Sequence, residues 1–164
     1  MFTSFSDLDP ERERWDNFTA SHGAPIYMSF DWCRTWWEFY GGRRSLAVFL
    51  IFAGQELAGL LPMYVDRFGI GPLATRLARL IGVGDGPTRT FDPPLRTDIA
   101  SLAVRTVIEI LIDQEQCDLV SLGPVTAAQV VTQQDDQIIL VSKKAVTIKL
   151  PLKNIPVLSR NTRG

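Results

Sequence analysis

Leu46-Ala-Val-Phe-Leu-Ile-Phe52 is apolar at every position, and a turn at Ala53-Gly-Gln-Glu56 follows it directly. A run of this length without a polar break is typical of a strand that is buried on both faces of a sheet. Leu57–Val65 is a second apolar run beyond the turn, so the two runs predict a long β-hairpin. Pro62 has no backbone N–H to donate, and we expect a bulge or a sheet edge at this residue.

Two helices are predicted before this hairpin. The first starts at Asp9-Pro10, because Asp caps and Pro fits the first turn, and it ends near His22-Gly23. Trp15 and Phe18 lie one turn apart on it and are expected to face the core. The second starts at Ser29 and ends at Gly41-Gly42, with a polar stripe at Asp31, Arg34, Thr35 and Glu38.

The rest of the chain alternates between strands and helices. A helix capped by Thr97 or Asp98 has the most regular apolar spacing, at Ile99, Leu102, Ala103, Thr106, Val107, Ile110 and Leu111. The remaining candidates are strands at 73–81, 118–122, 137–141 and 145–150 and a short helix at 126–133. This order predicts an α/β domain with a mixed sheet flanked by helices.

Composition narrows the range of functions. The 164 residues carry a net charge of −1 with the signs interspersed and no dense basic run, which argues against nucleic-acid binding. No apolar run is long enough to span a membrane, and the first residues lack the pattern of a signal peptide, so we expect a cytoplasmic protein. Cys33 and Cys117 have neither redox nor zinc spacing and are interpreted as buried thiols.

Several aromatic and Pro/Gly positions resemble a known family. They are Trp15-Asp-x-Phe18, Pro25-x-x-x-Ser-Phe-x-Trp32, Trp36-Trp-x-x-x-Tyr-Gly-Gly42, Gly59-x-Leu-Pro-Met63 and Leu80-Ile-Gly82 before the acidic loop from Asp85 to Asp92. Leu150-Pro151 and Leu158-Ser-Arg160-Asn-Thr-Arg163 resemble the family's junction between a strand and a basic helix. Together these positions resemble the opening half of GNAT-type acyltransferases of the CelD-like, or BioF-like, group.

The resemblance implies a GNAT-like fold, in which one three-layer domain of the acyl-CoA N-acyltransferase type covers residues 1–150. Members of the group look like two such folds in tandem, similar to the FemAB aminoacyltransferases, and the acyl-CoA site is associated mainly with the second fold. Residues 151–164 are then a frayed tail or a truncated junction between domains. The implied parent reaction transfers an acyl group from acyl-CoA to an amine, in envelope or exopolysaccharide (cellulose) biosynthesis.

The only match to a coenzyme A motif is Arg79-Leu-Ile-Gly82-Val-Gly84. A GNAT fold holds the coenzyme's pyrophosphate on glycine N–H groups and on a helix N-terminus that follows them directly. Here Pro87, Pro93 and Pro94 come before the next helix, so the match is a weak candidate and no resident cofactor is expected.

Other candidate groups are few. Trp32, Trp36, Trp37 and Tyr40 are either core residues or, with Asp85 and Asp92, the wall of a groove for a substrate or for the missing second fold. Asp85, Asp92, Asp98 and Glu109 are carboxylates of the kind that act as a base, but the sequence does not indicate burial. His22 is interpreted as a helix cap in preference to a catalytic group, and no catalytic or metal-binding residue is assigned.

Three functions remain open on the sequence. The first is the N-terminal, non-catalytic half of an acyltransferase, whose partner is a second GNAT fold or another chain and which self-associates when that partner is missing. The second is a stand-alone, non-catalytic GNAT-like binding or interaction module. The third is a self-sufficient acetyltransferase that uses Arg79, Gly82 and Gly84.

Overall fold

A computed structural model describes residues 1–71, 74–83, 93–123, 138–142 and 145–149. The predicted hairpin is its longest feature, with β1 (Ser45–Ala53) antiparallel to β2 (Glu56–Phe68). The turn at Gly54-Gln55 closes the hairpin, and Gly54 adopts a positive φ of 67° that favours glycine. The strands extend to both sides of the predicted ranges, so the prediction of a hairpin is confirmed.

The sheet has six strands in the order β1-β2-β3-β4-β6-β5. β3 (Thr75–Leu80) is antiparallel to β2, and β4 (Leu119–Gly123) is parallel to β3. β6 (Ala145–Lys149) lies between β4 and β5 (Ile138–Ser142) and is antiparallel to both. The mixed sheet predicted from the sequence is therefore confirmed.

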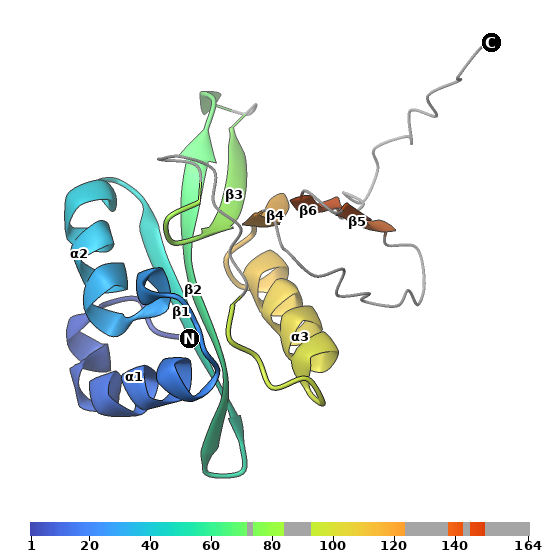
Figure 1. Ribbon diagram of the computed structural model, residues 1–164. Helices are drawn as coiled ribbons and strands as arrows, with labels where there is room; N and C mark the ends of the chain where they lie inside the picture. The colour runs from blue at the N-terminus through green and yellow to red at the C-terminus, as the bar shows by residue number, and fades with distance from the viewer. Residues whose placement is uncertain (72–73, 84–92, 124–137, 143–144, 150–164) are drawn as a thin grey trace.

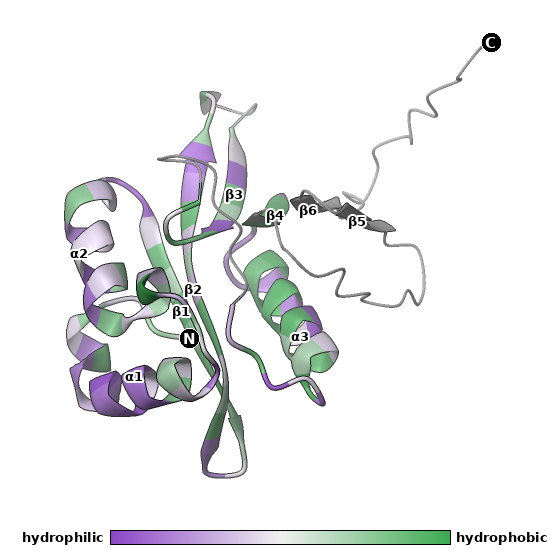
Figure 2. Cartoon of the chain, viewed as in Figure 1, coloured by the Kyte–Doolittle hydropathy of each residue, from purple (hydrophilic) through white to green (hydrophobic). Residues whose placement is uncertain are grey.

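Both faces of β1 and β2 are covered, as Figure 1 shows, with α1 and α2 on one side of the sheet and α3 on the other. Leu46 and Val48 belong to the core cluster on the side of α1 and α2. Ala47 and Phe49 alternate with them and belong to the cluster on the side of α3. The unbroken apolar run follows from this arrangement, because successive residues from Leu46 to Phe49 are buried in one core or the other. The hairpin is correspondingly hydrophobic along most of its length (Figure 2).

Pro62 does not produce the bulge that we expected. The register shift between β1 and β2 falls at Ile51/Phe52, while Pro62 pairs in regular register with Val48. Val48 exchanges both backbone hydrogen bonds with Phe2 on its outer side, so the Val48–Pro62 pair needs no N–H from proline. On the other side of β2, the N–H of Leu60 donates to the carbonyl of Pro94, and the pairing with β3 starts at Met63. Pro62 lies between these two contacts.

The first helical layer contains η1 (Ser6–Glu11), α1 (Arg12–Ser21), η2 (Ile26–Met28) and α2 (Phe30–Tyr40). Trp15 and Phe18 face the core as predicted, at 0% and 8% exposed. The Trp15 indole N–H donates to the carbonyl of Met28 at 2.8 Å, and its ring meets Phe30 edge-on at 5.4 Å between centroids. This layer is therefore held by aromatic packing with its one buried indole donor satisfied.

The predicted caps of the first two helices are wrong in detail. Asp9 and Pro10 lie inside η1, so α1 starts at Arg12 and the Asp9 side chain does not cap it. Ser29 precedes α2, but its hydroxyl donates to the carbonyl of Ile26. The Phe30 N–H instead donates to Asp16 Oδ1 at 2.9 Å, so α2 is capped by a side chain from the middle of α1.

The second layer is α3 (Ala100–Asp113). Thr97 and Asp98 do not cap it, because Ile99 occupies the N-cap position and Asp98 forms two hydrogen bonds with the guanidinium of Arg96. The predicted strands at 73–81, 118–122, 137–141 and 145–150 correspond to β3, β4, β5 and β6. The predicted helix at 126–133 and the predicted tail at 151–164 lie outside the described residues.

Candidate functional site: an apolar groove between β1 and α3

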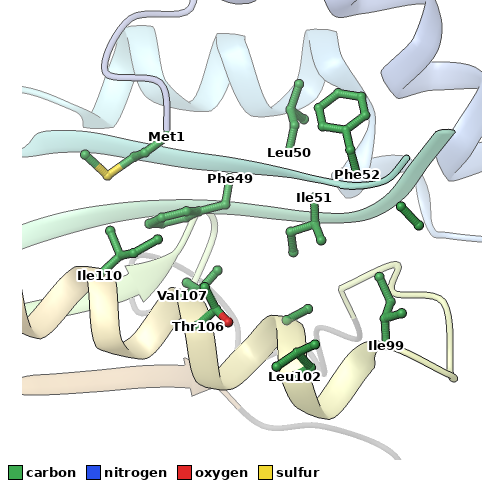
Figure 3. Close-up of a pocket in the computed structure, with 12 residues that line it drawn as sticks. Met1, Phe49, Leu50, Ile51, Phe52, Ile99, Leu102, Thr106, Val107 and Ile110 are labelled. Carbon is green, nitrogen blue, oxygen red and sulfur yellow. The ribbon is translucent and has the colours of Figure 1, made fainter. Parts of the chain in front are cut away.

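An open groove of about 410 Å³ lies between the edge strand β1 and helix α3. Figure 3 shows Phe49 and Ile51 of β1 pointing toward α3 across it, whereas Leu50 and Phe52 point to the other side of the strand. The groove is lined by Met1, Phe49, Leu50, Ile51, Phe52, Ala53, Ile99, Leu102, Ala103, Thr106, Val107 and Ile110. Its volume falls within the range of about 300–1,000 Å³ that is usual for sites that bind small molecules.

The groove exists because α3 is apolar over more than one stripe. Its buried residues are Ala100, Ala103, Val104, Val107, Ile108 and Leu111, which pack on the sheet. Ile99, Leu102, Thr106 and Ile110 lie next to that stripe and line the groove. Leu102 remains 67% exposed. The helix predicted from the apolar spacing is therefore confirmed, and of the residues in that spacing Ala103, Val107 and Leu111 are buried on the sheet.

The sequence contains the signal for this groove, although our sequence interpretation missed it. The predicted apolar positions and the residues Ala100, Val104 and Ile108 together cover more of the helix than one sheet can bury. The surplus points to a second contact surface. β1 adds to it, because it is the edge strand of the sheet and its Ile51 side chain is only half-buried on the side of α3.

The lining sets what the groove can do chemically. It contains no ionisable side chain, and Thr106 supplies its one polar side chain. Such a surface binds apolar groups by removing them from water, and its side chains offer no acid or base for proton transfer. It is a binding or docking surface.

The aromatic residues of α2 lie on the opposite face of the sheet from this groove. Trp36 is buried, with its ring 5.2 Å from that of Tyr64, and Trp32 and Trp37 are half-buried against the same cluster. Tyr40 is 53% exposed and stacks on Trp36 at 5.4 Å. Trp36 is thus a core residue, Trp32 and Trp37 lie at the edge of the core, and Tyr40 lies at the surface. Asp85 and Asp92, which the sequence grouped with them, lie outside the described residues.

The candidate coenzyme A residues follow β3. The guanidinium of Arg79 lies over the ring of Phe68, 5.1 Å from its centroid. Gly82 adopts a positive φ of 87° just after the strand, and Tyr64 Oη donates to the carbonyl of the next residue, Val83, at 3.0 Å. Gly84 lies outside the described residues. α3 begins only at Ala100, after residues 94–96 have paired with β2.

The remaining titratable candidates have structural partners. His22 Nδ1 lies 2.9 Å from the carbonyl of Phe18, in the last turn of α1 as the capping interpretation predicts. Asp98 is exposed, and its hydrogen bond with Arg96 holds the pKa of its carboxyl below the ordinary value. Glu109 is exposed and pairs with Arg105 on the next turn of α3. Among the described residues, no three His, Cys, Asp or Glu side chains gather as a metal site.

Both cysteines are free and buried, on opposite faces of the sheet. Burial raises the pKa of the Cys33 thiol far above its ordinary value, with a smaller contribution from the carboxylate of Asp16. Burial also raises the pKa of Cys117 to about 11, against the opposing effect of Arg76. Both thiols are therefore protonated at neutral pH and are poor nucleophiles.

Comparison with known proteins adds no assignment. No protein family, no curated protein and no solved structure matches the chain. Within the part of the chain that the structure describes, no helix has the length and hydrophobicity that crossing a bilayer requires.

Proposed function

We propose that this chain is the N-terminal, non-catalytic half of a GNAT-type N-acyltransferase, whose parent enzyme transfers an acyl group from acyl-CoA to an amine. The residues that carry the resemblance also suggest envelope or exopolysaccharide biosynthesis as the setting. In this proposal the chain supplies a scaffold, and a second acyltransferase domain docks on its apolar groove.

The sheet supports the proposal. The resemblance implies a three-layer fold with a mixed sheet, an antiparallel meander and a helical crossover. Strands β1, β2 and β3 form such a meander, and α3 lies on the connection from β3 to the parallel strand β4. Helices lie on both faces (Figure 1).

The groove between β1 and α3 is the observation that carries the proposal. It combines an edge strand with a helix whose apolar surface exceeds what its own sheet buries. Leu102 stays 67% exposed, although full burial of a leucine side chain contributes about 1.5–3 kcal/mol. A second domain that covers both elements would recover this free energy and extend the core. The side chains of the lining are uncharged, which fits an apolar partner surface.

The same groove favours a second candidate function, which is a stand-alone binding module. In that case the occupant is a small apolar ligand, for which the volume is sufficient. The two functions differ in solution behaviour. A docking surface without its partner associates with a second copy of itself, whereas a finished binding module stays monomeric when its ligand is absent.

Gel filtration with light scattering tests the proposal. We expect the wild-type chain to form dimers or larger species as its concentration rises. Leu102→Asp should make it monomeric, because a charge is then placed at the centre of the contact. Ile26→Asp is the matched control, since Ile26 is 77% exposed on η2, away from the groove, and this variant should associate like the wild type.

Two outcomes would contradict docking at the groove. One is a wild-type chain that is monomeric at every concentration, which would favour the binding module. The other is association that Ile26→Asp abolishes and Leu102→Asp leaves unchanged. Circular dichroism and thermal melts confirm that each variant is folded before its association is compared.

A further inference from the structure

Arginines that are spread along the sequence meet at the end of the sheet opposite the β1–β2 turn. Arg67 and Phe68 end β2, and Ile70 follows in the turn to β3. Arg79 is opposite Tyr64 in the ladder, but its guanidinium reaches this end and lies over the ring of Phe68. Arg43 lies at the same end of the sheet, because the next residue, Arg44, donates a hydrogen bond from Nε to Asp66 Oδ2 at 3.0 Å. We name these five residues, Arg43, Arg67, Phe68, Ile70 and Arg79, the basic tip.

Ile70 is presented to solvent by its backbone. It is 90% exposed and lies between Gly69 and Gly71, which adopt positive φ angles of 86° and 61°. Phe68, beside it, is 44% exposed and carries the guanidinium of Arg79 over its ring. Ile70 and Phe68 together therefore present apolar surface to solvent beside the arginines.

The acids near the basic tip do not neutralise it. Asp66 pairs with Arg44, and Glu115 pairs with Arg76 at 3.4 Å. Among the described residues, Arg43, Arg67 and Arg79 have no ion-pair partner. Arg67 also lies directly opposite Arg76 in the β2–β3 ladder, an arrangement of like charges that destabilises a sheet. Within the part of the chain that the structure describes, three arginines without an ion-pair partner therefore lie at one end of the sheet.

We propose that the basic tip binds the surface of anionic phospholipid membranes. The guanidinium groups match lipid phosphate and carboxylate groups in charge and geometry. Ile70 and Phe68 are placed to enter the interface between headgroups and acyl chains, where apolar side chains beside basic residues gain affinity. A nucleic acid fits less well, because the guanidinium of Arg79 already lies over the ring of Phe68 and the aliphatic Ile70 offers no flat face on which a base can stack.

The binding is peripheral and electrostatic in this proposal. Basic residues near an anionic surface each contribute roughly fivefold to affinity, and the contribution falls within a Debye length. Binding should therefore weaken steeply as salt is raised. The proposal is independent of the proposed function, since the basic tip lies at the opposite end of β2 from the hairpin turn and shares no residue with the apolar groove.

Co-sedimentation with vesicles tests the proposal with the full chain. At low ionic strength the wild type should pellet with vesicles of phosphatidylcholine and phosphatidylserine and stay in solution with pure phosphatidylcholine. The double variant Arg67→Gln/Arg79→Gln should bind about 25-fold more weakly, at roughly fivefold for each arginine. Ile70→Ser should weaken binding severalfold without changing its dependence on anionic lipid.

Matched controls separate the basic tip from general charge and hydrophobicity. Arg105→Gln removes an exposed arginine of α3, and Ile26→Ser removes an exposed isoleucine of η2. Both should bind vesicles like the wild type. If these controls lost as much vesicle binding as the variants of the basic tip, the proposal would be overturned. So would equal binding to pure phosphatidylcholine, or binding to a single-stranded oligonucleotide without binding to anionic vesicles.

Discussion

Asp16 links the two helices of the first layer through one hydrogen bond. Its carboxylate accepts the N–H of Phe30 and so satisfies a donor that the first turn of α2 would otherwise leave without a partner. Sequence rules do not reveal this cap, because Asp16 lies inside α1 and 14 residues before Phe30. Local capping rules pointed to Ser29, which satisfies the carbonyl of Ile26 instead. Tertiary contacts decide between such competing donors and acceptors.

Asp16→Ala should lower the free energy of unfolding by about 1 kcal/mol, the usual effect of removing a helix cap. Asp16→Asn keeps an oxygen acceptor at the same place and should cost clearly less. Urea denaturation followed by circular dichroism measures both variants. Equal stability of Asp16→Ala and the wild type would show that the cap does not contribute.

At the scale of elements, buried strands were predictable and amphipathic helix faces were only partly so. The run Leu46–Phe52 has one physical explanation, burial on both sides, and the structure confirms it. α3 has an excess of apolar residues, and periodicity alone left open which of them meet the sheet. Leu102 shares the apolar spacing with the buried residues but lines the groove.

The end of α2 depends on the absence of a side chain at Gly41. A Cβ there would lie 2.5 Å from the carbonyl oxygen of Trp37 and 2.9 Å from its ring. Gly42, by contrast, has open space around it and a positive φ of 50°, so a side chain there costs only backbone strain.

Gly41→Ala should therefore destabilise the protein by about 2 kcal/mol or more, through overpacking against Trp37. Gly42→Ala should cost about 1 kcal/mol, from the left-handed backbone alone. Thermal melts of the two variants under identical conditions provide the comparison. A larger loss at Gly42 than at Gly41 would contradict this account of the helix end.

At the scale of the whole molecule, the fold brings together what the sequence separates. The groove combines β1 with α3, and the basic tip combines arginines from the α2–β1 turn, β2 and β3. Single-sequence reasoning judged Arg43 and Arg79 separately and found no dense basic run. These arginines come close together because β2 and β3 pair on either side of their turn, and the composition of the chain does not indicate which strands pair.

The central claim is that this chain is the half of an acyltransferase that does not hold acyl-CoA. A thermal-shift titration with acetyl-CoA tests it most directly, because a ligand that binds only the folded state raises the melting temperature. We predict that saturating acetyl-CoA leaves the melting temperature unchanged. A rise of several degrees that Arg79→Ala abolishes would contradict the claim and would favour a self-sufficient acetyltransferase.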